Sequence, residues 1–182
     1  ALEMDIDGNI VVKTAMTDIG TGTGTSMRNI VHEITGVPLN KIKIDLGKST
    51  LPQAPSQGGS RGLSSISASS NAIAETLKSE LIAYAAKINP EFKNLIPSNI
   101  ILTDSAVQIK NTSTSVSFQK IFSENKLTVI EVEETTEPGA LQKNFAFASG
   151  AAHCCRVKVN ELTGKVKIDR LVSVGDGGKI VR

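Results

Sequence analysis

Two short segments rich in glycine and hydroxyl residues are the part of this sequence best suited to hold a ligand. They read Gly20-Thr21-Gly22-Thr23-Gly24-Thr25 and Gln57-Gly58-Gly59-Ser60-Arg61-Gly62. Glycine lets the backbone approach a ligand closely, and the first N–H groups of a following helix attract an anion, with the helix dipole behind them. The threonine hydroxyls add donors to the first segment. Arg61 can give paired, charge-assisted hydrogen bonds to phosphate oxygens in the second. Each segment therefore predicts a site for an anionic group.

Each segment stands between a predicted strand and a predicted helix. Residues 1–16 read as a hairpin with Asp7-Gly8 at its turn, and residues 41–47 alternate like a strand. Helical spacing after the first segment places four apolar residues on one face, with Gly36 as the stop. They are Met27, Ile30, Val31 and Ile34. A second helix, over roughly 64–88, has Ile66, Ile73, Leu77, Leu81 and Ile88 on its inner face.

The repeated order of strand, loop and helix predicts that the two loops act together. If the strands before the loops are neighbours in a sheet, both loops leave the same edge and converge on one ligand. A pyrophosphate fits that arrangement better than a single phosphate. The alternative is that each loop is only a hairpin exit capped by its own hydroxyls.

Neither loop has the spacing of a common nucleotide-binding motif. The first reads G-x-G-x-G with Thr25 where a dinucleotide-binding fingerprint has its third glycine, and residues 38–41 contain no carboxylate for a ribose. The second lacks the Gly-Lys-Ser/Thr of a Walker A loop.

The rest of the chain favours an α+β fold, with a two-layer mixed sheet that carries helices on one face. Residues 99–110 read as two short strands around a turn at Asp104-Ser105, and Ser117 can cap a short helix. Residues 152–174 read as a long hairpin. We divide the chain into a ligand-binding half, 1–92, and a second α+β half, 93–182, which is truncated at its C-terminus.

Composition excludes several classes of protein. Hydrophobic residues make up 40% of the 182, as in an ordinary globular domain. The net charge is +2 and aromatic residues are 3%, so neither the basic surface nor the stacking platform of a nucleic-acid binder is present. No apolar run is long enough to span a membrane. The compartment stays open between cytoplasm and periplasm.

Residues 18–77, which contain both loops, resemble the molybdenum-cofactor-binding subunit of the xanthine oxidase and aldehyde oxidase superfamily. The family pattern there is D-[IM]-G-Q-G-T, then ELGVP, then G-S-G-G-S-R. Residues 149–181, SGAAHCCRVKVNELTGKVKIDRLVSVGDGGKIV, resemble a second family stretch. The two blocks cover about half of the chain in the right order. The sequence is thus identified as an internal fragment of such a subunit.

The resemblance implies that both loops bind the dinucleotide tail and phosphates of a molybdopterin cofactor, with Gly58, Gly59 and Ser60 beside its molybdenum end. Bacterial relatives usually carry the cytosine dinucleotide form. Where members often have glutamine in the first loop, this chain has Thr21, so a side-chain amide is replaced by a hydroxyl. Iron–sulfur clusters and FAD are implied on partner subunits or domains. The remainder of the molybdenum subunit is a further partner, and a homodimer is an additional expectation.

The family's catalytic parts are absent from the sequence. Its essential glutamate stands in a Gly-Glu-Pro motif, whereas Glu137-Pro138 follows Thr136 and lies at a different place, so we assign Glu137 no catalytic role. We expect part of a molybdenum hydroxylase that acts on an aldehyde or an N-heterocycle, with the fragment itself inactive. The alternative is a non-catalytic module that binds a phosphorylated ligand or packs against partner subunits.

The other polar residues have structural readings that compete with functional ones. Asp18 either caps backbone N–H groups or merely ends a strand. Asp176 reads as a turn residue, although the resemblance places an aspartate near the cofactor there. His153, Cys154 and Cys155 are read as parts of a partly buried strand, because alternation puts only two of them on one face and two ligands do not close a zinc site. His32 is expected at the surface or at its boundary.

Overall fold

The computed structural model describes residues 1–59, 61–137, 144 and 148–178. Contacts divide the chain into two compact units, Ala1–Glu137 and Pro138–Arg182. The division at residue 92 that we predicted from the sequence separates a ligand-binding half from a second half. Because it concerns ligand binding, it stays a prediction.

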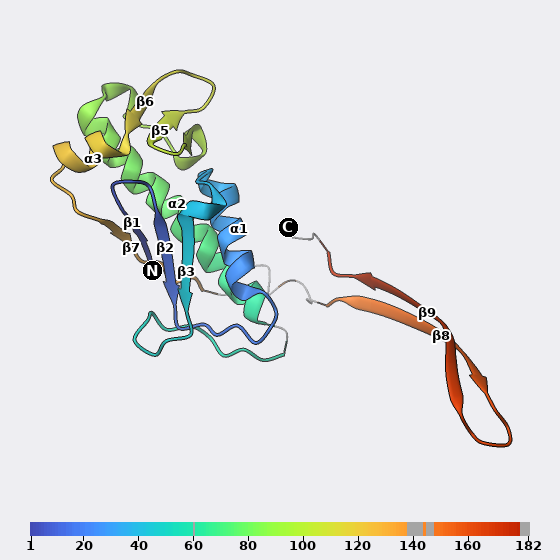
Figure 1. Cartoon of the computed structure of the whole chain (residues 1–182). Helices are drawn as coiled ribbons and strands as arrows, with labels where there is room; N and C mark the ends of the chain where they lie inside the picture. Colours follow the sequence, from blue (N-terminus) through green and yellow to red (C-terminus); the bar gives the residue numbers. More distant parts are fainter. Residues whose placement is uncertain (60, 138–143, 145–147, 179–182) are drawn as a thin grey trace. The chain divides into compact units, whose positions relative to one another are not determined.

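A four-stranded mixed sheet lies at the centre of the first unit (Figure 1). Its strands are β1 (Leu2–Met4), β2 (Ile10–Thr14), β3 (Ile42–Leu46) and β7 (Ile130–Val132), in the order β3-β2-β1-β7. β2 and β3 are parallel, whereas β1 is antiparallel to both β2 and β7. The predicted turn at Asp7-Gly8 joins β1 to β2, where Gly8 has a φ of +80°. The predicted hairpin is confirmed.

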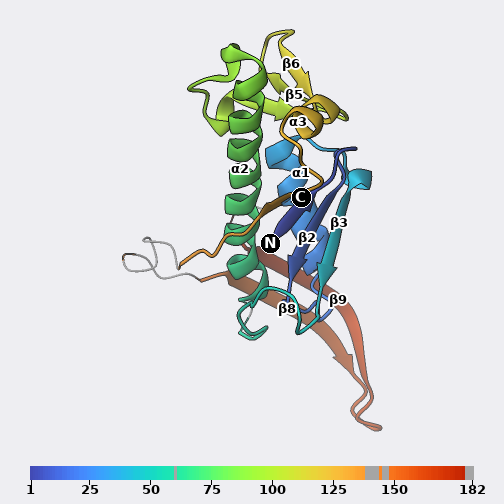
Figure 2. The same ribbon diagram turned by 90° about the vertical axis from the view of Figure 1, so that its left-hand side faces the viewer.

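Two helices cover one face of this sheet, as Figures 1 and 2 show. They are α1 (Thr23–Thr35) and α2 (Gly62–Ile88). Alternate strand residues such as Leu2, Met4 and Ile10 point towards the helices and are fully buried. On the helices, Met27 and Val31 of α1 and Leu77 of α2 are buried in the same cluster. The α+β, two-layer arrangement predicted from the sequence is confirmed.

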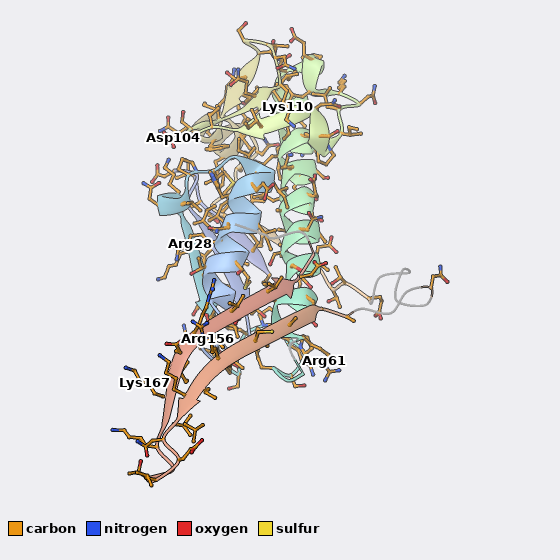
Figure 3. The ribbon with its side chains drawn as sticks, turned by 90° about the vertical axis from the view of Figure 1, so that its right-hand side faces the viewer. Arg28, Arg61, Asp104, Lys110, Arg156 and Lys167 are labelled. Carbon is orange, nitrogen blue, oxygen red and sulfur yellow. The ribbon has the colours of Figure 1, made fainter. Side chains whose placement is uncertain are left out.

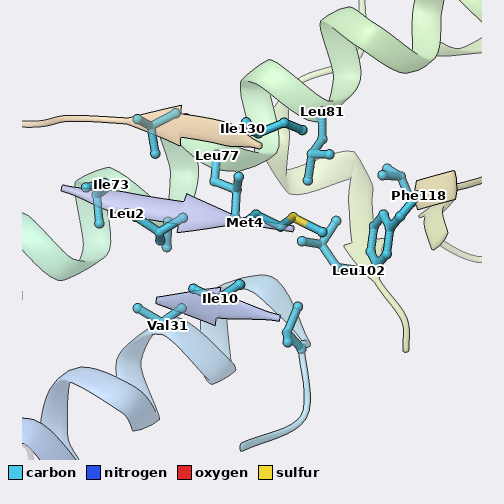
Figure 4. Close-up of a cluster of buried hydrophobic side chains, with 14 of the residues drawn as sticks. Leu2, Met4, Ile10, Val31, Ile73, Leu77, Leu81, Leu102, Phe118 and Ile130 are labelled. Carbon is cyan, nitrogen blue, oxygen red and sulfur yellow. The ribbon is translucent and has the colours of Figure 1, made fainter. Parts of the chain in front are cut away.

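Buried residues recur along α2 from Gly62 to Ala85, and Figure 4 shows the part of the core around Leu77. Ile73, Leu77 and Leu81 of α2 meet the strand residues, and Leu102 and Phe118 extend the cluster towards a second, smaller sheet. Because the buried apolar residues of α2 recur at helical spacing, the sequence was enough to identify this face.

The smaller sheet has the order β4-β5-β6, from β4 (Ile100–Leu102), β5 (Ala106–Ile109) and β6 (Ser115–Ser117). Short 3₁₀ turns at Pro90–Phe92 and Pro97–Asn99 lead into it, and another at Leu39–Lys41 precedes β3. β6 runs into α3 (Phe118–Glu124), where the Oγ of Ser117 accepts a hydrogen bond from the N–H of Lys120 at 3.2 Å. The predicted cap at Ser117 is confirmed.

One buried charge holds α1 to α2. Lys78 of α2 is 2% exposed, and its Nζ donates a hydrogen bond to the carbonyl of Ile34 in the last turn of α1 at 3.2 Å. Burial lowers the pKa of Lys78, Glu75 raises it and Lys110 lowers it further, so that it lies below its ordinary value. A cation beside the last carbonyls of a helix is favourable for the helix dipole.

The second unit is a two-stranded antiparallel hairpin of β8 (Gly150–Val159) and β9 (Val166–Asp176). A bulge between Arg156 and Val157 shifts its register. Strand alternation and pairing place an apolar set on one face of the hairpin and a charged set on the other. The apolar set, which lies beyond the bulge, is Val157, Val159, Val166 and Ile168. The charged set is Lys158 and Lys167 beyond the bulge and the pair Arg156 and Arg170 before it. Asp169 forms ion pairs with Arg156 at 2.7 Å and Lys158 at 3.4 Å.

Cys154 and Cys155 are free and exposed on this hairpin, and the Nδ1 of His153 is hydrogen-bonded to the Oγ of Ser173 at 2.9 Å. The expectation of a partly buried strand was wrong for the described part of this unit. A two-stranded ribbon has no second layer to cover either of its faces.

Candidate functional site

Both glycine-rich loops leave the same edge of the central sheet. The first follows β2 and the second follows β3, and these strands are parallel neighbours, so their carboxyl ends lie side by side. The N–H of Ala15 donates to the carbonyl of Pro52 at 2.8 Å, and the N–H of Gly47 donates to the carbonyl of Thr14 at 3.2 Å. The neighbouring strands on which the predicted convergence depended are therefore present. A crevice at the carboxyl ends of parallel strands is where open α/β sheets bind ligands.

The side chain of Gln57 connects the two loops directly. Its Nε2 donates a hydrogen bond to the backbone carbonyl of Thr17 and lies 3.4 Å from the Oγ1 of Thr23, the first residue of α1. Thr23 is buried, and its hydroxyl is in turn 3.2 Å from that of Thr21. One amide thus contacts the beginning and the end of the first loop.

The carboxylate of Asp18 organises the first loop from within. Its oxygens accept hydrogen bonds from the N–H groups of Gly20 at 3.0 Å, Gly22 at 3.1 Å and Gly24 at 3.4 Å. Desolvation raises the pKa of Asp18, but the backbone donors of Gly20, Gly24, Gly22 and Thr21 together lower it by more, so that it lies below its ordinary value. Of the two readings of Asp18, the structure shows the cap.

This cap leaves fewer donors for a ligand than the glycine pattern suggests. The N–H groups of Thr23 and Thr25 make no hydrogen bond to the described residues. The side chain of Thr25 is exposed, as is that of Thr21. Hydroxyl groups and the start of α1, rather than the N–H groups of the three glycines, are the donors the first loop has to offer.

The second loop is open where it precedes α2. A Cβ added at Gly58 or at Gly59 would meet nothing within 4 Å, and Gly59 has a φ of +56°. The N–H of Arg61 donates to the carbonyl of Gly58 at 3.2 Å, and its Nε lies 3.4 Å from the same oxygen. α2 begins at Gly62, so the N–H groups of its first turn have no partner within the helix. Ser60 lies outside the described residues.

Two arginines lie near the helix N-termini (Figure 3). Arg61 is exposed at the start of α2, and Arg28 is exposed one turn into α1. Arg28, Thr25 and Asp18 line an open hollow beside the first loop, together with Lys43 of β3. The exposed charges that flank the loops are mostly positive, which favours an anionic ligand.

A small cavity of about 60 Å³ lies beside residues 52–55, which precede the second loop. Pro52 and Ala54 of that segment, Thr14 of β2, and Ile66 and Ser70 of α2 are among its lining residues. Ser70 is 2% exposed, and its Oγ has no hydrogen-bond partner among the described residues. No feature of the sequence singles out this hydroxyl, because a serine within a helix is expected to face solvent.

The remaining candidates have structural roles. The Oδ1 of Asp176 accepts a hydrogen bond from the N–H of Gly178 at 3.0 Å, as a turn residue does. The Nδ1 of His32 is 2.7 Å from the carbonyl of Val37, and this histidine is half-buried at the boundary where it was expected. Among the residues that the structure describes, no three His, Cys, Asp or Glu side chains group as a metal site requires. No helix in that part of the chain is long and apolar enough to cross a membrane.

Comparison of the sequence with protein families matches residues 1–182 to the molybdopterin cofactor-binding domain. The chain is 29% identical over 180 residues to the aldehyde oxidoreductase molybdenum-binding subunit PaoC of Escherichia coli K12, covering 99% of this chain and 23% of that protein. It is 22% identical over 194 residues to the nicotine 6-hydroxylase large subunit of Paenarthrobacter nicotinovorans, covering 99% of this chain and 22% of that one. The chain thus spans about a quarter of the length of these relatives.

Solved structures share the fold. A Cu,Mo-CO dehydrogenase in its carbon monoxide reduced state matches with a TM-score of 0.69 at 16% identity, over 99% of this chain and 23% of that one. Quinoline 2-oxidoreductase from Pseudomonas putida 86 matches with a TM-score of 0.64 at 16% identity, over the same shares of the two chains. At these identities the likeness concerns the fold alone.

Proposed function

The chain belongs to the molybdopterin cofactor-binding domain family, and from this premise we propose that its two adjoining loops hold the dinucleotide tail and phosphates of that cofactor. The observation that carries the proposal is the contact from Gln57 to Thr17 and Thr23, at an edge where two parallel strands end together. Two helix N-termini are thereby placed beside one another. Two adjacent sets of N–H donors suit a ligand with two linked phosphates.

The residues present fit such a group. Gly58 and Gly59 leave open space that a Cβ would narrow, so a phosphate can approach the backbone closely. The guanidinium of Arg61 is exposed beside them and matches phosphate oxygens in geometry and charge. Asp18 is negatively charged, as a phosphate is, but its carboxylate oxygens accept hydrogen bonds from N–H groups of its own loop.

We assign the cofactor contacts to the residues of the two loops. They are Gly20, Thr21, Gly22, Thr23, Gly24 and Thr25 in the first, and Gln57, Gly58, Gly59, Ser60 and Arg61 in the second. In this proposal the first loop contributes hydroxyl groups and the N-terminus of α1. The second contributes the backbone at Gly58–Gly59 and the charge of Arg61, beside the molybdenum end. When bound, the cofactor supplies the metal at which a substrate is oxidised.

For the whole protein we propose a molybdenum hydroxylase that acts on an aldehyde or an electron-poor N-heterocycle. The relatives named aldehyde oxidoreductase and nicotine 6-hydroxylase support these two substrate classes. In this proposal the rest of the molybdenum subunit completes the active site, and the fragment alone is inactive. The cofactor is the cytosine dinucleotide form, and partner subunits carry iron–sulfur clusters and flavin.

The cofactor content of the whole protein, purified from its own host with any co-purifying subunits, tests the proposal. We expect near-stoichiometric molybdenum together with cytidine monophosphate released by acid. Molybdenum with a different nucleotide would overturn the cytosine form alone. A folded, matured sample with neither molybdenum nor nucleotide would refute the function and favour a module that binds a simpler phosphate.

Substitution of Gly58 tests the site itself. Its φ is not in the left-handed region and no atom lies within 4 Å of an added Cβ, so Gly58→Leu is expected to leave the fold intact. The larger side chain would occupy the space proposed for the ligand, and molybdenum retention should fall at least tenfold, with a smaller loss for Gly58→Ala. Unchanged retention in the leucine variant would contradict the assignment of the second loop.

A further inference from the structure

We propose that Gln57 is a positioning residue that joins the two glycine-rich loops into one preformed site, and that its side chain does not contact the ligand. This inference rests on the proposed function. It changes the role of the Gln57 side chain from a direct contact with the cofactor to positioning of the loops that bind it. The backbone of the second loop keeps the role given above.

The amide of Gln57 is directed into the protein. Nε2 donates to the carbonyl of Thr17 and lies 3.4 Å from the Oγ1 of Thr23, so it faces the first loop at both of its ends. These contacts span 40 and 34 residues of sequence. A ligand that needed this amide would have to break the link between the loops.

The opposite side of the same amide rests on the first residue of α2. A Cβ built at Gly62 would lie 2.2 Å from the Oε1 of Gln57 and 2.9 Å from its Cδ. Gly62 is buried and its φ is not in the left-handed region, so glycine is required there for space rather than for conformation. The side chain of Gln57 therefore lies between the start of α1 and the start of α2.

Hydrogen bonds within the first loop hold together the residues that Gln57 contacts. Asp18 gathers the N–H groups of Gly20, Gly22 and Gly24, and the buried hydroxyl of Thr23 relays the contact to Thr21. The exposed hydroxyl groups that remain for a ligand are thus held by a scaffold that includes Gln57. Holding donors in place before binding lowers the entropy lost on binding, which raises affinity without a new contact.

Hydrogen exchange of the backbone amides of residues 17–24, in the whole protein freed of cofactor, tests the link without any ligand. Loss of a hydrogen bond of about 0.5–1.5 kcal/mol predicts roughly two- to thirteenfold faster exchange in Gln57→Ala. Gln57→Glu keeps the shape of the side chain but turns the donor into an acceptor that faces the Thr17 carbonyl. Its backbone amides should exchange at least as fast as those of Gln57→Ala. Arg61→Ala is the matched control. It lies in the same loop outside the link, and its exchange should stay within about twofold of the wild type.

A double variant separates a specific link from general loosening. Gly62→Ala alone should raise exchange, because its methyl group displaces the Gln57 amide. In Gln57→Ala with Gly62→Ala the clash is gone, so the pair should exchange no faster than Gln57→Ala alone. Additive effects, or exchange in Gln57→Ala equal to the wild type, would overturn the proposal.

Molybdenum retention then relates the link to function. We expect lower retention in Gln57→Ala and in Arg61→Ala, with faster exchange in the first only. If the wild-type protein held no molybdenum, the proposed function would fail while the exchange data still tested the link. If Gln57→Ala changed retention but not exchange, Gln57 would be a direct ligand contact and this inference would be wrong.

Discussion

The carboxylate of Asp18 accepts a hydrogen bond from the N–H of Gly22 at 3.1 Å, four residues later in the same loop. Gly22 is the N-cap of α1 and has a φ of +74°, a conformation that turns its N–H back towards Asp18. The chain thus supplies an anion of its own to a loop that has the composition of an anion site. Binding of phosphate by the N–H groups of the loop glycines would require Asp18 to move aside.

Replacing Asp18 by asparagine should destabilise the protein in a pH-dependent way. Because the folded-state pKa of Asp18 lies below its ordinary value of 3.8, its ionised form contributes stability above pH 3.8. That contribution is lost as the pH falls through the lowered folded pKa. The difference in unfolding free energy between wild type and Asp18→Asn, measured by urea unfolding, should therefore be constant near neutrality and shrink below about pH 3.8. A difference independent of pH down to pH 2 would show that the charge contributes nothing.

The buried Lys78 should make the stability of the protein depend on pH in the alkaline range. Its folded-state pKa lies below 10.5, so between the two values the unfolded chain binds more protons and stability rises with pH. Lys78→Met keeps most of the packing and removes the titration. The wild type should gain stability relative to Lys78→Met as the pH is raised towards 10.5, with no relative change below the folded pKa. Parallel pH profiles would contradict a shifted pKa at Lys78.

The elements that the sequence predicted are those with a local signal. Asp7-Gly8 specifies a hairpin turn, Met27, Ile30 and Val31 specify one face of α1, and Ser117 caps α3. In each case residues within about one or two turns of each other determine the structure. The adjacency of the two loops was predicted only on the condition that the strands before them are neighbours, and the parallel pairing of β2 with β3 meets that condition.

The features that the sequence missed depend on contacts between distant residues. The amide of Gln57 could equally have faced a ligand, and only the position of Thr17 directs it inward. Lys78 reads as a solvent-facing lysine of α2 until the end of α1 is placed beside it. No glycine or proline at Arg156 or Val157 indicates the bulge in the sequence, although the bulge changes which residues lie on each face of the hairpin.

Leu77 is one of the fully buried leucines of α2, and its truncation should be costly. It is fully buried in the cluster where α2 meets the central sheet, and Leu77→Ala is expected to lower the free energy of unfolding by about 2–5 kcal/mol. Leu63→Ala is the matched control on the same helix. Leu63 is 38% exposed and its truncation should cost less than about 1 kcal/mol. Urea unfolding of the two variants measures both values, and similar losses would show that the core does not extend along α2 as described.

Alanine variants of two glycines with positive φ distinguish the cost of a strained backbone conformation from the cost of a steric clash. Gly36 ends α1 with a φ of +87°, and a Cβ there would lie 2.7 Å from the Cγ1 of Ile101 and 2.8 Å from the carbonyl oxygen of Leu102. Gly47 has a φ of +78° with nothing within 4 Å. Gly47→Ala should therefore cost only the left-handed conformation, about 1 kcal/mol. Gly36→Ala adds the clash, for a total of roughly 2–4 kcal/mol.

The comparison also tests how firmly the smaller sheet is held against α1. The methyl group of Gly36→Ala is opposed by the backbone of Leu102 as well as by a side chain, so rotation of Ile101 alone cannot relieve it. Equal losses in the two glycine variants, measured by urea unfolding, would mean that β4 moves away from α1 at no cost. A larger loss at Gly36 shows that Leu102, whose side chain is buried in the core, fixes the distance between β4 and the end of α1.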